Sequence, residues 1–598
     1  MQMNSSLSHS FQAKTSADTP WRPWLRWSYR TTLNKDKKLN IRKKEYIMAL
    51  FKKGLVVALS SALLLGACGT ETGGTDNGSA EQTTESTEDK KVVTFESKTE
   101  LSTLDGSTYD LPTTNMYLNI VESFYRKTGE GNEVELGLAA NHEISEDGLT
   151  HTLTLRDDIF WENGDPIVAA DFVFGAQRSV DPESAVYPSA SDEILVNGDA
   201  VRSGEMSPTE LGVEAPDEKT VVYHLNYPTP TFEFSLSGLR WAPIQEKFYN
   251  EVGAENYGTS SDNIMATGAY KLENWQTSAS EWSLVKNENY YDHESVDIDQ
   301  IDFKVVPETS TAVQLYESGQ LDFATLTPDF VPEFEGHEDF AQDLTTFSGN
   351  METNQKVDIT ANDHFGRAMF YAIDREELTE NILADGSLPV AGYVPYELDK
   401  SVDGVDYREE AGHYYNFDAT KAQEELDAAF KELDIESAEL TMIVSEDGQD
   451  PQVAEFIQSQ LETNLENISV NIEQLPLMSL YERMGKDDWD LVYYTNTPFL
   501  PDAFAILEWS YSDGINLAKY NNEKYDELLD QAKYDFGTDP RKRRDIMMEA
   551  EELKVYEDAS NSTLHQNQRS YLVNPEIENF ETLPVSGYLY FRNVKLNQ

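Results

Sequence analysis

Residues 137–182 read GLAANHEISEDGLTHTLTLRDDIFWENGDPIVAADFVFGAQRSVDP. The tetrads EDGL at 146–149 and NGDP at 163–166 are typical of tight turns, because Asn, Asp and Gly tolerate the backbone angles that turns require. The leucines of 151–155 alternate with polar residues, which is the period of a half-buried strand. Asp171 stands where it can cap a helix that follows Ala170. The stretch therefore predicts a hairpin followed by a helix, which identifies a fold and not a reaction.

A second segment, 440–494, alternates between strand and helix patterns. Apolar residues alternate with polar ones at 440–444 and again at 468–472, while residues 453–461 carry an apolar stripe with helical spacing. The run LVYY at 491–494 is typical of a buried strand. Strand–helix–strand order predicts a right-handed crossover and parallel pairing, so we expect an α/β fold.

Composition narrows the class of protein. The chain has 598 residues, enough for about three to four lobes or domains. It carries 46 Lys and Arg against 108 Asp and Glu, a formal net charge of −62. Such a surface repels phosphate backbones, so we expect no nucleic-acid partner. The single cysteine, Cys68, excludes an intramolecular disulfide and metal sites built on several thiolates.

Catalytic motifs are missing from the sequence. It contains no G-x-S-x-G, no H-E-x-x-H, no P-loop and no dinucleotide fingerprint, and none of its nine histidines pairs with another at metal-ligand spacing. Asp487, Asp488 and Asp490, around Trp489, would suit paired catalytic carboxylates, but a polar loop leading into the strand at Leu491 is the simpler interpretation. We therefore expect no enzyme activity, no cofactor and no metal.

The segment 48–68, MALFKKGLVVALSSALLLGAC, indicates export and lipidation. Two lysines precede an apolar core, 55–65, which has signal-peptide length and is too short to span a bilayer. The core ends in LGAC, which resembles the lipobox of bacterial lipoproteins, where the cysteine becomes the lipid-carrying N-terminus. We expect a signal peptide at 48–67 and a lipid on Cys68. The protein would then be held at the extracellular face of the cell membrane by its lipid anchor alone.

The segments on either side of this signal also have expected roles. Residues 1–47 are basic and without pattern, and Lys44-Glu45 can be encoded by a ribosome-binding sequence just before Met48. We expect Met48 to be the true start and 1–47 to be an over-extended reading frame. Residues 68–91 are rich in Gly, Ser, Thr and acidic residues, which predicts a flexible tether between membrane and folded part.

Residues 137–182 resemble the signature of the family 5 extracellular solute-binding proteins, a group that binds oligopeptides, dipeptides or nickel. The similarity extends from Val92 to the end of the chain. Further matching motifs are TGAY at 267–270 with Trp275, NYY at 289–291, RA to IDR at 367–375, and YNN to YD at 520–526. The segments 129–133 and 257–261 are most similar to the oligopeptide-binding lipoproteins of Gram-positive ABC importers.

The resemblance implies a two-lobed fold like that of periplasmic binding proteins, with a hinge of two segments and a central ligand cleft. Lobe one is expected at 92–346 and again at 564–598, with an inserted subdomain at about 136–245. Lobe two is expected at 347–563.

The resemblance also implies a peptide site. Oligopeptide-binding members contact the peptide largely through main-chain pairing, with water-filled pockets for its side chains. By motif position the two peptide-pairing strands are Leu111-Pro112-Thr113 and Tyr494-Thr495-Asn496. Tyr494 either lines the cleft, as an aromatic often does in the family, or is a core aromatic at a strand end.

Two positions depart from the family pattern. Relatives usually have an aspartate, which pairs with the peptide α-amine, four residues before a proline that matches Pro501. Thr497 stands there instead, and Asp502 or Asp513 is the alternative partner of the amine. The second departure is Ser560, because relatives usually have proline after the preceding Asp-Ala.

These features predict an extracellular peptide-binding lipoprotein that acts as a monomer and delivers oligopeptides to the permease subunits of an ABC transporter. The alternative keeps the fold and changes the ligand. It is a dedicated receptor for a signalling peptide of the pheromone type or for a non-peptide solute, and the missing aspartate favours it. A surface hydrolase or adhesin is a third possibility, but no set of nucleophile, base and orienting group is visible.

Overall fold

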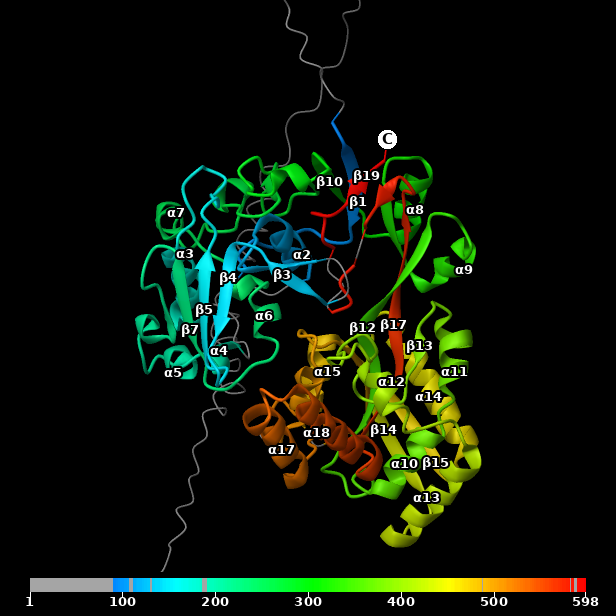
Figure 1. The fold of residues 1–598 in the computed structure, drawn as a ribbon. Coiled ribbons are helices and arrows are strands. Elements are labelled where there is room, and N and C mark those ends of the chain that lie inside the picture. The colour runs from blue at the N-terminus through cyan, green and yellow to red at the C-terminus, as the bar shows by residue number, and fades with distance from the viewer. Residues whose placement is uncertain are drawn as a thin grey trace, which may run out of the picture. The chain divides into compact units, whose positions relative to one another are not determined.

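The computed structural model describes residues 90–106, 111–128, 132–184, 191–486, 488–512, 514–580, 582–585 and 589–597 (Figure 1). The predicted over-extended N-terminus, the signal peptide, Cys68 and all of the tether except its last two residues lie outside the described residues.

Eleven strands of the described residues form one mixed sheet. Its order is β15–β14–β16–β12–β17–β11–β1–β10–β9–β8, and the short β13 pairs with β17. The strands are β1 (Val92–Ser97), β8 (Tyr270–Glu273), β9 (Glu281–Lys286), β10 (Gln300–Val305), β11 (Phe323–Leu326), β12 (Phe340–Thr353), β13 (Leu388–Pro389), β14 (Ala438–Ser445), β15 (Ile468–Leu475), β16 (Leu491–Asn496) and β17 (Asn561–Val573).

Two small two-stranded sheets accompany the large one, β2 (Tyr125–Lys127) with β3 (Val134–Leu136) and β18 (Ile577–Glu578) with β19 (Lys595–Leu596).

The longer helices are α2 (Leu111–Ile120), α3 (Ala169–Val180), α8 (Thr309–Glu317), α10 (Asp363–Tyr371), α13 (Ala419–Leu433), α14 (Asp450–Asn464), α15 (Leu477–Met484), α17 (Glu523–Asp530) and α18 (Pro540–Glu552).

The β14–α14–β15 unit confirms the predicted strand–helix–strand order and parallel pairing, while the right-handed sense of the crossover stays a prediction. β14 pairs in parallel with β15 on one side and with β16 on the other. Both faces of this part of the sheet are covered, as is usual for parallel strands. Leu440 and Met442 of β14 pack into a core that includes α10, α13 and α14, whereas Ile443 faces the other way, against Leu480 and Met484 of α15. Alternation along each strand therefore decides which side chains lie under which helices.

Residues 137–182 form part of a separate four-stranded antiparallel sheet. Its order is β4 (Ala139–Ile144), β5 (Thr150–Leu155), β7 (Thr220–His224), β6 (Val213–Glu214), and α3 shares its core. The turn between β4 and β5 contains Gly148 at φ +69°, a left-handed conformation that favours glycine. The predicted hairpin and the helix after it are confirmed.

The predicted cap of that helix, Asp171, is wrong by three positions. α3 begins at Ala169, and Val168, its N-cap residue, has no side-chain oxygen to offer the helix. Asp171 therefore lies in the first turn and reaches back, accepting the backbone N–H of Val168 and the indole N–H of Trp161, each at 3.1 Å. The carboxylate ties the helix start to the preceding turn.

Two long strands connect the two halves of the large sheet. β12 and β17 pair antiparallel from Phe340 opposite Leu572 to Glu352 opposite Asn561, with a register shift between Leu344 and Ser348. β11 pairs with one end of β17, and β16 pairs with the opposite end of β12. The predicted lobe boundaries, 346/347 and 563/564, fall inside these two strands and stay a prediction.

A fully buried ion pair stabilises the part of the chain around α18. The guanidinium of Arg408 contacts the carboxylate of Glu551 through two hydrogen bonds, at 2.6 and 3.0 Å. The same carboxylate accepts the backbone N–H groups of Tyr393, at 2.6 Å, and of Val394, at 2.9 Å. Gly392 allows this approach, because an added Cβ there would lie 1.6 Å from Arg408 Nη1.

We predict that Glu551→Ala lowers the free energy of unfolding by about 3–5 kcal/mol, because it leaves a buried guanidinium without its counter-charge. Urea denaturation measures the loss. Glu549→Ala is the matched control, since Glu549 lies on the same helix and pairs with Lys524 at 3.2 Å while both side chains are half exposed. It should lose at most about 1 kcal/mol. Equal losses in the two variants would contradict the assignment.

Candidate functional site

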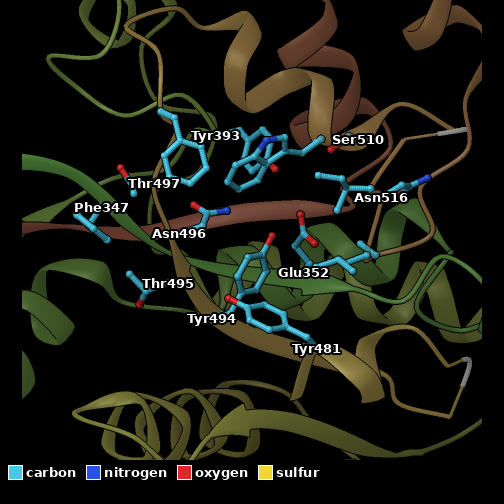
Figure 2. A pocket seen from close by; sticks show the side chains of 15 residues that line it. Phe347, Glu352, Tyr393, Tyr481, Tyr494, Thr495, Asn496, Thr497, Ser510 and Asn516 are labelled. Carbon is cyan, nitrogen blue, oxygen red and sulfur yellow. The ribbon is translucent and has the colours of Figure 1, made fainter. Parts of the chain in front are cut away.

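A cavity of about 460 Å³ lies at the carboxyl end of β16 (Figure 2). Its described lining comes from β12, β16, α15 and the segments that follow β13 and β16. The lining residues are Phe347, Glu352, Tyr393, Tyr481, Tyr494, Thr495, Asn496, Thr497, Phe499, Trp509, Ser510, Ile515, Asn516, Leu517 and Ala518. The cavity thus contains the predicted residues Tyr494, Thr495, Asn496 and Thr497.

The other predicted segment, 111–113, is not part of this lining. The strand expected there is wrong, because these residues begin helix α2, where a proline in the first turn is well tolerated. The hydroxyl of Thr113 donates to the backbone oxygen of Thr103 at 2.6 Å. The side chains of Leu111 and Pro112 lie outside what the structure describes, and their contact with a ligand stays a prediction.

Tyr494 is both a core aromatic and a cavity residue. It lies on the same face of β16 as Val492 and packs in the cluster that contains Trp489 and Leu480 of α15. Its hydroxyl end faces the cavity beside Glu352 (Figure 2). The pKa of Tyr494 is raised well above its usual range, mainly by burial and secondly by the charge of Glu352. The hydroxyl therefore stays protonated.

Glu352 is a buried carboxylate in the cavity lining that the sequence reasoning missed. Its Oε1 lies 3.5 Å from Nζ of the buried Lys554 and accepts the side-chain amide of Asn561 at 3.1 Å. Burial lowers the pKa of Lys554, and the charge of Glu352 opposes this shift. The sequence signal for Glu352 is an acidic residue within a strand next to the predicted hinge.

Thr497 is buried and already has hydrogen-bonding partners. Its hydroxyl lies 2.8 Å from the hydroxyl of Thr346, which also contacts the backbone oxygen of Pro584. Thr497 therefore ties the end of β16 to β12 near the register shift between β12 and β17.

Asp502, one of the two expected alternative amine partners, does not fill the place of the missing aspartate, and Asp513 stays a prediction. Asp502 makes two hydrogen bonds to the guanidinium of the buried Arg543, each at 2.9 Å, and it is outside the described lining of the cavity. Asp513 lies outside the described residues.

The acidic residues around Trp489 have structural contacts, as the polar-loop interpretation predicts. Asp490 accepts the backbone N–H of Thr441 at 2.7 Å, and Asp488 contacts Arg483 at 2.9 Å. Asp487 lies outside the described residues. Within the part of the chain that the structure describes, no group of three or more His, Cys, Asp or Glu residues is placed to hold a metal ion. None of the described helices is long and apolar enough to cross a membrane.

Several contacts among the described residues join the four-stranded sheet and its neighbouring segments to the region that holds the cavity. The rings of Tyr227 and Tyr534 meet edge to face, with centroids 5.5 Å apart. Lys533 Nζ lies 3.6 Å from the carboxylate of Glu193. The amide of Asn132 donates to a backbone oxygen, that of Glu397, at 2.9 Å.

Comparison with known proteins identifies the family. The family model described as bacterial extracellular solute-binding proteins, family 5 Middle, matches residues 133–518. The chain belongs to this family, as the sequence resemblance predicted.

Individual relatives match most of the chain. The dipeptide-binding protein of Lactococcus lactis subsp. cremoris is 29% identical over 548 residues, covering 88% of this chain and 95% of its own length. The substrate-binding domain of an oligopeptide ABC transporter from Bacillus anthracis is 31% identical, with a TM-score of 0.70, covering 85% of this chain and 99% of that one. The pheromone receptor PrgZ, solved with its mode of peptide binding, is 28% identical with a TM-score of 0.70, covering 85% of this chain and 100% of that one. The fold is therefore the two-lobed fold of periplasmic binding proteins.

Proposed function

We propose that this protein captures oligopeptides outside the cell and delivers them to the permease of an ABC importer. The observation that carries the proposal is the open edge of β16 beside the cavity. β14 pairs with β16 only as far as Tyr493, so within the described residues 494–496 have a strand partner, β12, on one edge only. An unpaired strand edge can bind an extended peptide through main-chain hydrogen bonds that are the same for every sequence. The names of the relatives, which include dipeptide- and oligopeptide-binding proteins, support the same ligand class.

The alternative is a dedicated receptor for a signalling peptide or for a non-peptide solute. Two observations favour it. Thr497, where relatives usually have an aspartate, uses its hydroxyl on Thr346, and one relative of similar fold is a pheromone receptor. A dedicated receptor would retain one ligand from a mixture of peptides, whereas a general oligopeptide-binding protein would retain many.

We predict that the purified protein retains many members of a defined library of four- to eight-residue peptides, because main-chain pairing is independent of sequence. Mass spectrometry of the retained fraction measures this. Retention of one sequence alone would support the signalling receptor. Retention of no peptide at all would contradict peptide transport.

The compartment is part of the proposal. We propose that cleavage before Cys68 and lipidation of its thiol hold the protein, as a monomer, at the extracellular face of the cell membrane. The LGAC motif and the apolar core before it support this placement, and membership of an extracellular family agrees with it. A binding protein without catalytic function, cofactor or nucleic-acid partner fits the same set of observations.

We predict that Cys68→Ser in the expressing cell leaves the precursor uncleaved or releases the protein into the medium, because serine cannot carry the thioether lipid. Immunoblotting of membrane and medium fractions measures it. Ser79→Ala, in the predicted tether, is the control and should not change the distribution. A Cys68→Ser protein that is still cleaved and still membrane-bound would contradict the anchor.

A further inference from the structure

The cavity beside β16 has an apolar mouth. Tyr481, Phe499 and Ile515 line it and are 38%, 53% and 67% exposed. Exposed large apolar side chains that gather at one concave site are typical of a binding surface. At about 460 Å³ the cavity is in the lower part of the range of ligand pockets, which is about 300–1,000 Å³. It therefore has room for one large side chain and the adjoining main chain, but not for a whole oligopeptide.

Asn496 supplies a hydrogen-bond donor to this cavity. The orientation of its amide follows from its neighbours, because an amide's oxygen and nitrogen are assigned from their partners. Asn350 Nδ2 donates to the backbone oxygen of Ser348 at 3.0 Å, and a carbonyl only accepts. The same nitrogen donates to Asn496 Oδ1 at 2.9 Å, while the hydroxyl of Thr563 donates to Asn350 Oδ1 at 2.8 Å.

Asn496 Nδ2 is consequently the free end of this chain of hydrogen bonds. The nitrogen is buried and has no partner among the described residues, and the residue is 8% exposed. Figure 2 shows the side chain directed into the cavity, between Thr497 and Glu352. A buried donor without a partner is unfavourable, so the site favours a ligand that brings an acceptor.

The charges around the cavity cancel. Glu352 is the one carboxylate in the described lining. Lys554, which is outside that lining, neutralises its charge. A ligand ammonium would compete with Lys554, and it would also face a donor at Asn496. A ligand carboxylate would find no unpaired cation in the described lining. Burying either charge without a partner is costly, which leaves an uncharged ligand segment.

We propose that the cavity selects peptides by a large apolar or aromatic side chain, which packs between Tyr481, Trp509 and Ile515. Asn496 Nδ2 donates a hydrogen bond to the adjoining main-chain carbonyl oxygen of the peptide. The ligand class is then an oligopeptide with an uncharged, bulky residue at this position, and no free amine is required there. The inference rests on the proposed peptide function and adds the chemistry of the residue that is recognised.

Titration calorimetry with a set of alanine hexapeptides tests the proposal. Each peptide carries one Phe, Lys or Glu, placed in turn at every position, and the all-alanine peptide is the reference. We expect one position at which Phe binds at least tenfold tighter than Ala, which is about 1.4 kcal/mol, while Lys and Glu bind no better than Ala. Acetylating the Phe peptide should change its affinity less than tenfold. A hundredfold loss on acetylation would overturn the proposal by revealing an amine anchor.

Two pairs of variants separate the parts of the site. Asn496→Ala should weaken the Phe and all-alanine peptides about equally, by roughly tenfold, because it removes a main-chain contact. Asn471→Ala is its control, since the Asn471 amide contacts Glu439 on an exposed part of the same lobe. Ile515→Asp should weaken only the Phe peptide, and Val402→Asp, at another exposed apolar residue, should weaken neither.

The outcomes are distinct. If the peptides bind but Phe is not preferred at any position, or if Asn496→Ala and Ile515→Asp both bind like the unchanged protein, this inference is wrong while the proposed function stands. If no hexapeptide binds, the proposed function fails and the inference fails with it. Because Ile515 is largely exposed, its variant tests the apolar part of the site even where Asn496→Ala impairs folding.

Discussion

The antiparallel pairing of β12 with β17 is the interaction on which the rest of the molecule depends. β12 pairs with β16, which continues to β14 and β15, while β17 pairs with β11, which continues to β1, β10, β9 and β8. The β12–β17 pair therefore joins the two halves of the large sheet. The pairing is interrupted between Leu344 and Ser348, and this interruption is the place where two paired strands bend most easily. Two residues of the cavity lining lie next to this point, namely Phe347 on β12 and Thr497, which is hydrogen-bonded to Thr346.

The polar networks of the cavity are anchored on the same two strands. Asn350 and Glu352 belong to β12, and their partners Thr563 and Asn561 belong to β17. A ligand that hydrogen-bonds Asn496 is therefore two hydrogen bonds away from the β12–β17 pair. We expect a ligand that contacts both lobes to favour the state in which they are closed. We propose that the short connection between Asn496 and β12 is the route by which the ligand would act on the hinge.

Sequence patterns over a few residues predicted the strands, helices and turns whose formation depends on neighbouring residues in the chain. The alternation at 440–444 and 468–472 with a helical stripe between them gave the β14–α14–β15 unit, and the 137–182 motif gave a hairpin and a helix. Tyr494, Thr495, Asn496 and Thr497, which motif position assigned to the peptide site, line the cavity, and their contact with a peptide stays a prediction. The error at 111–113 arose because a short segment with a proline suits a helix start as well as an extended strand.

The remaining features of the site depend on contacts between distant parts of the chain. Glu352 is neutralised by Lys554, and Asn350 orients Asn496, across separations of 202 and 146 residues. Nothing in the sequence near either residue indicates these partners. The same holds for Asp502, which motif position made a candidate for the peptide amine and which the structure pairs with Arg543. A sequence does not show that a charged residue is buried unless the residue that carries the opposite charge is also known.

Small-angle X-ray scattering of the protein with and without a saturating hexapeptide tests the central claim most directly. That claim is a ligand cavity attached to a two-strand connection between lobes. A bound peptide that contacts both lobes should shift the population toward the closed state. The account predicts a smaller radius of gyration with peptide than without it. Superimposable scattering profiles, recorded under conditions in which calorimetry shows the site to be filled, would contradict it.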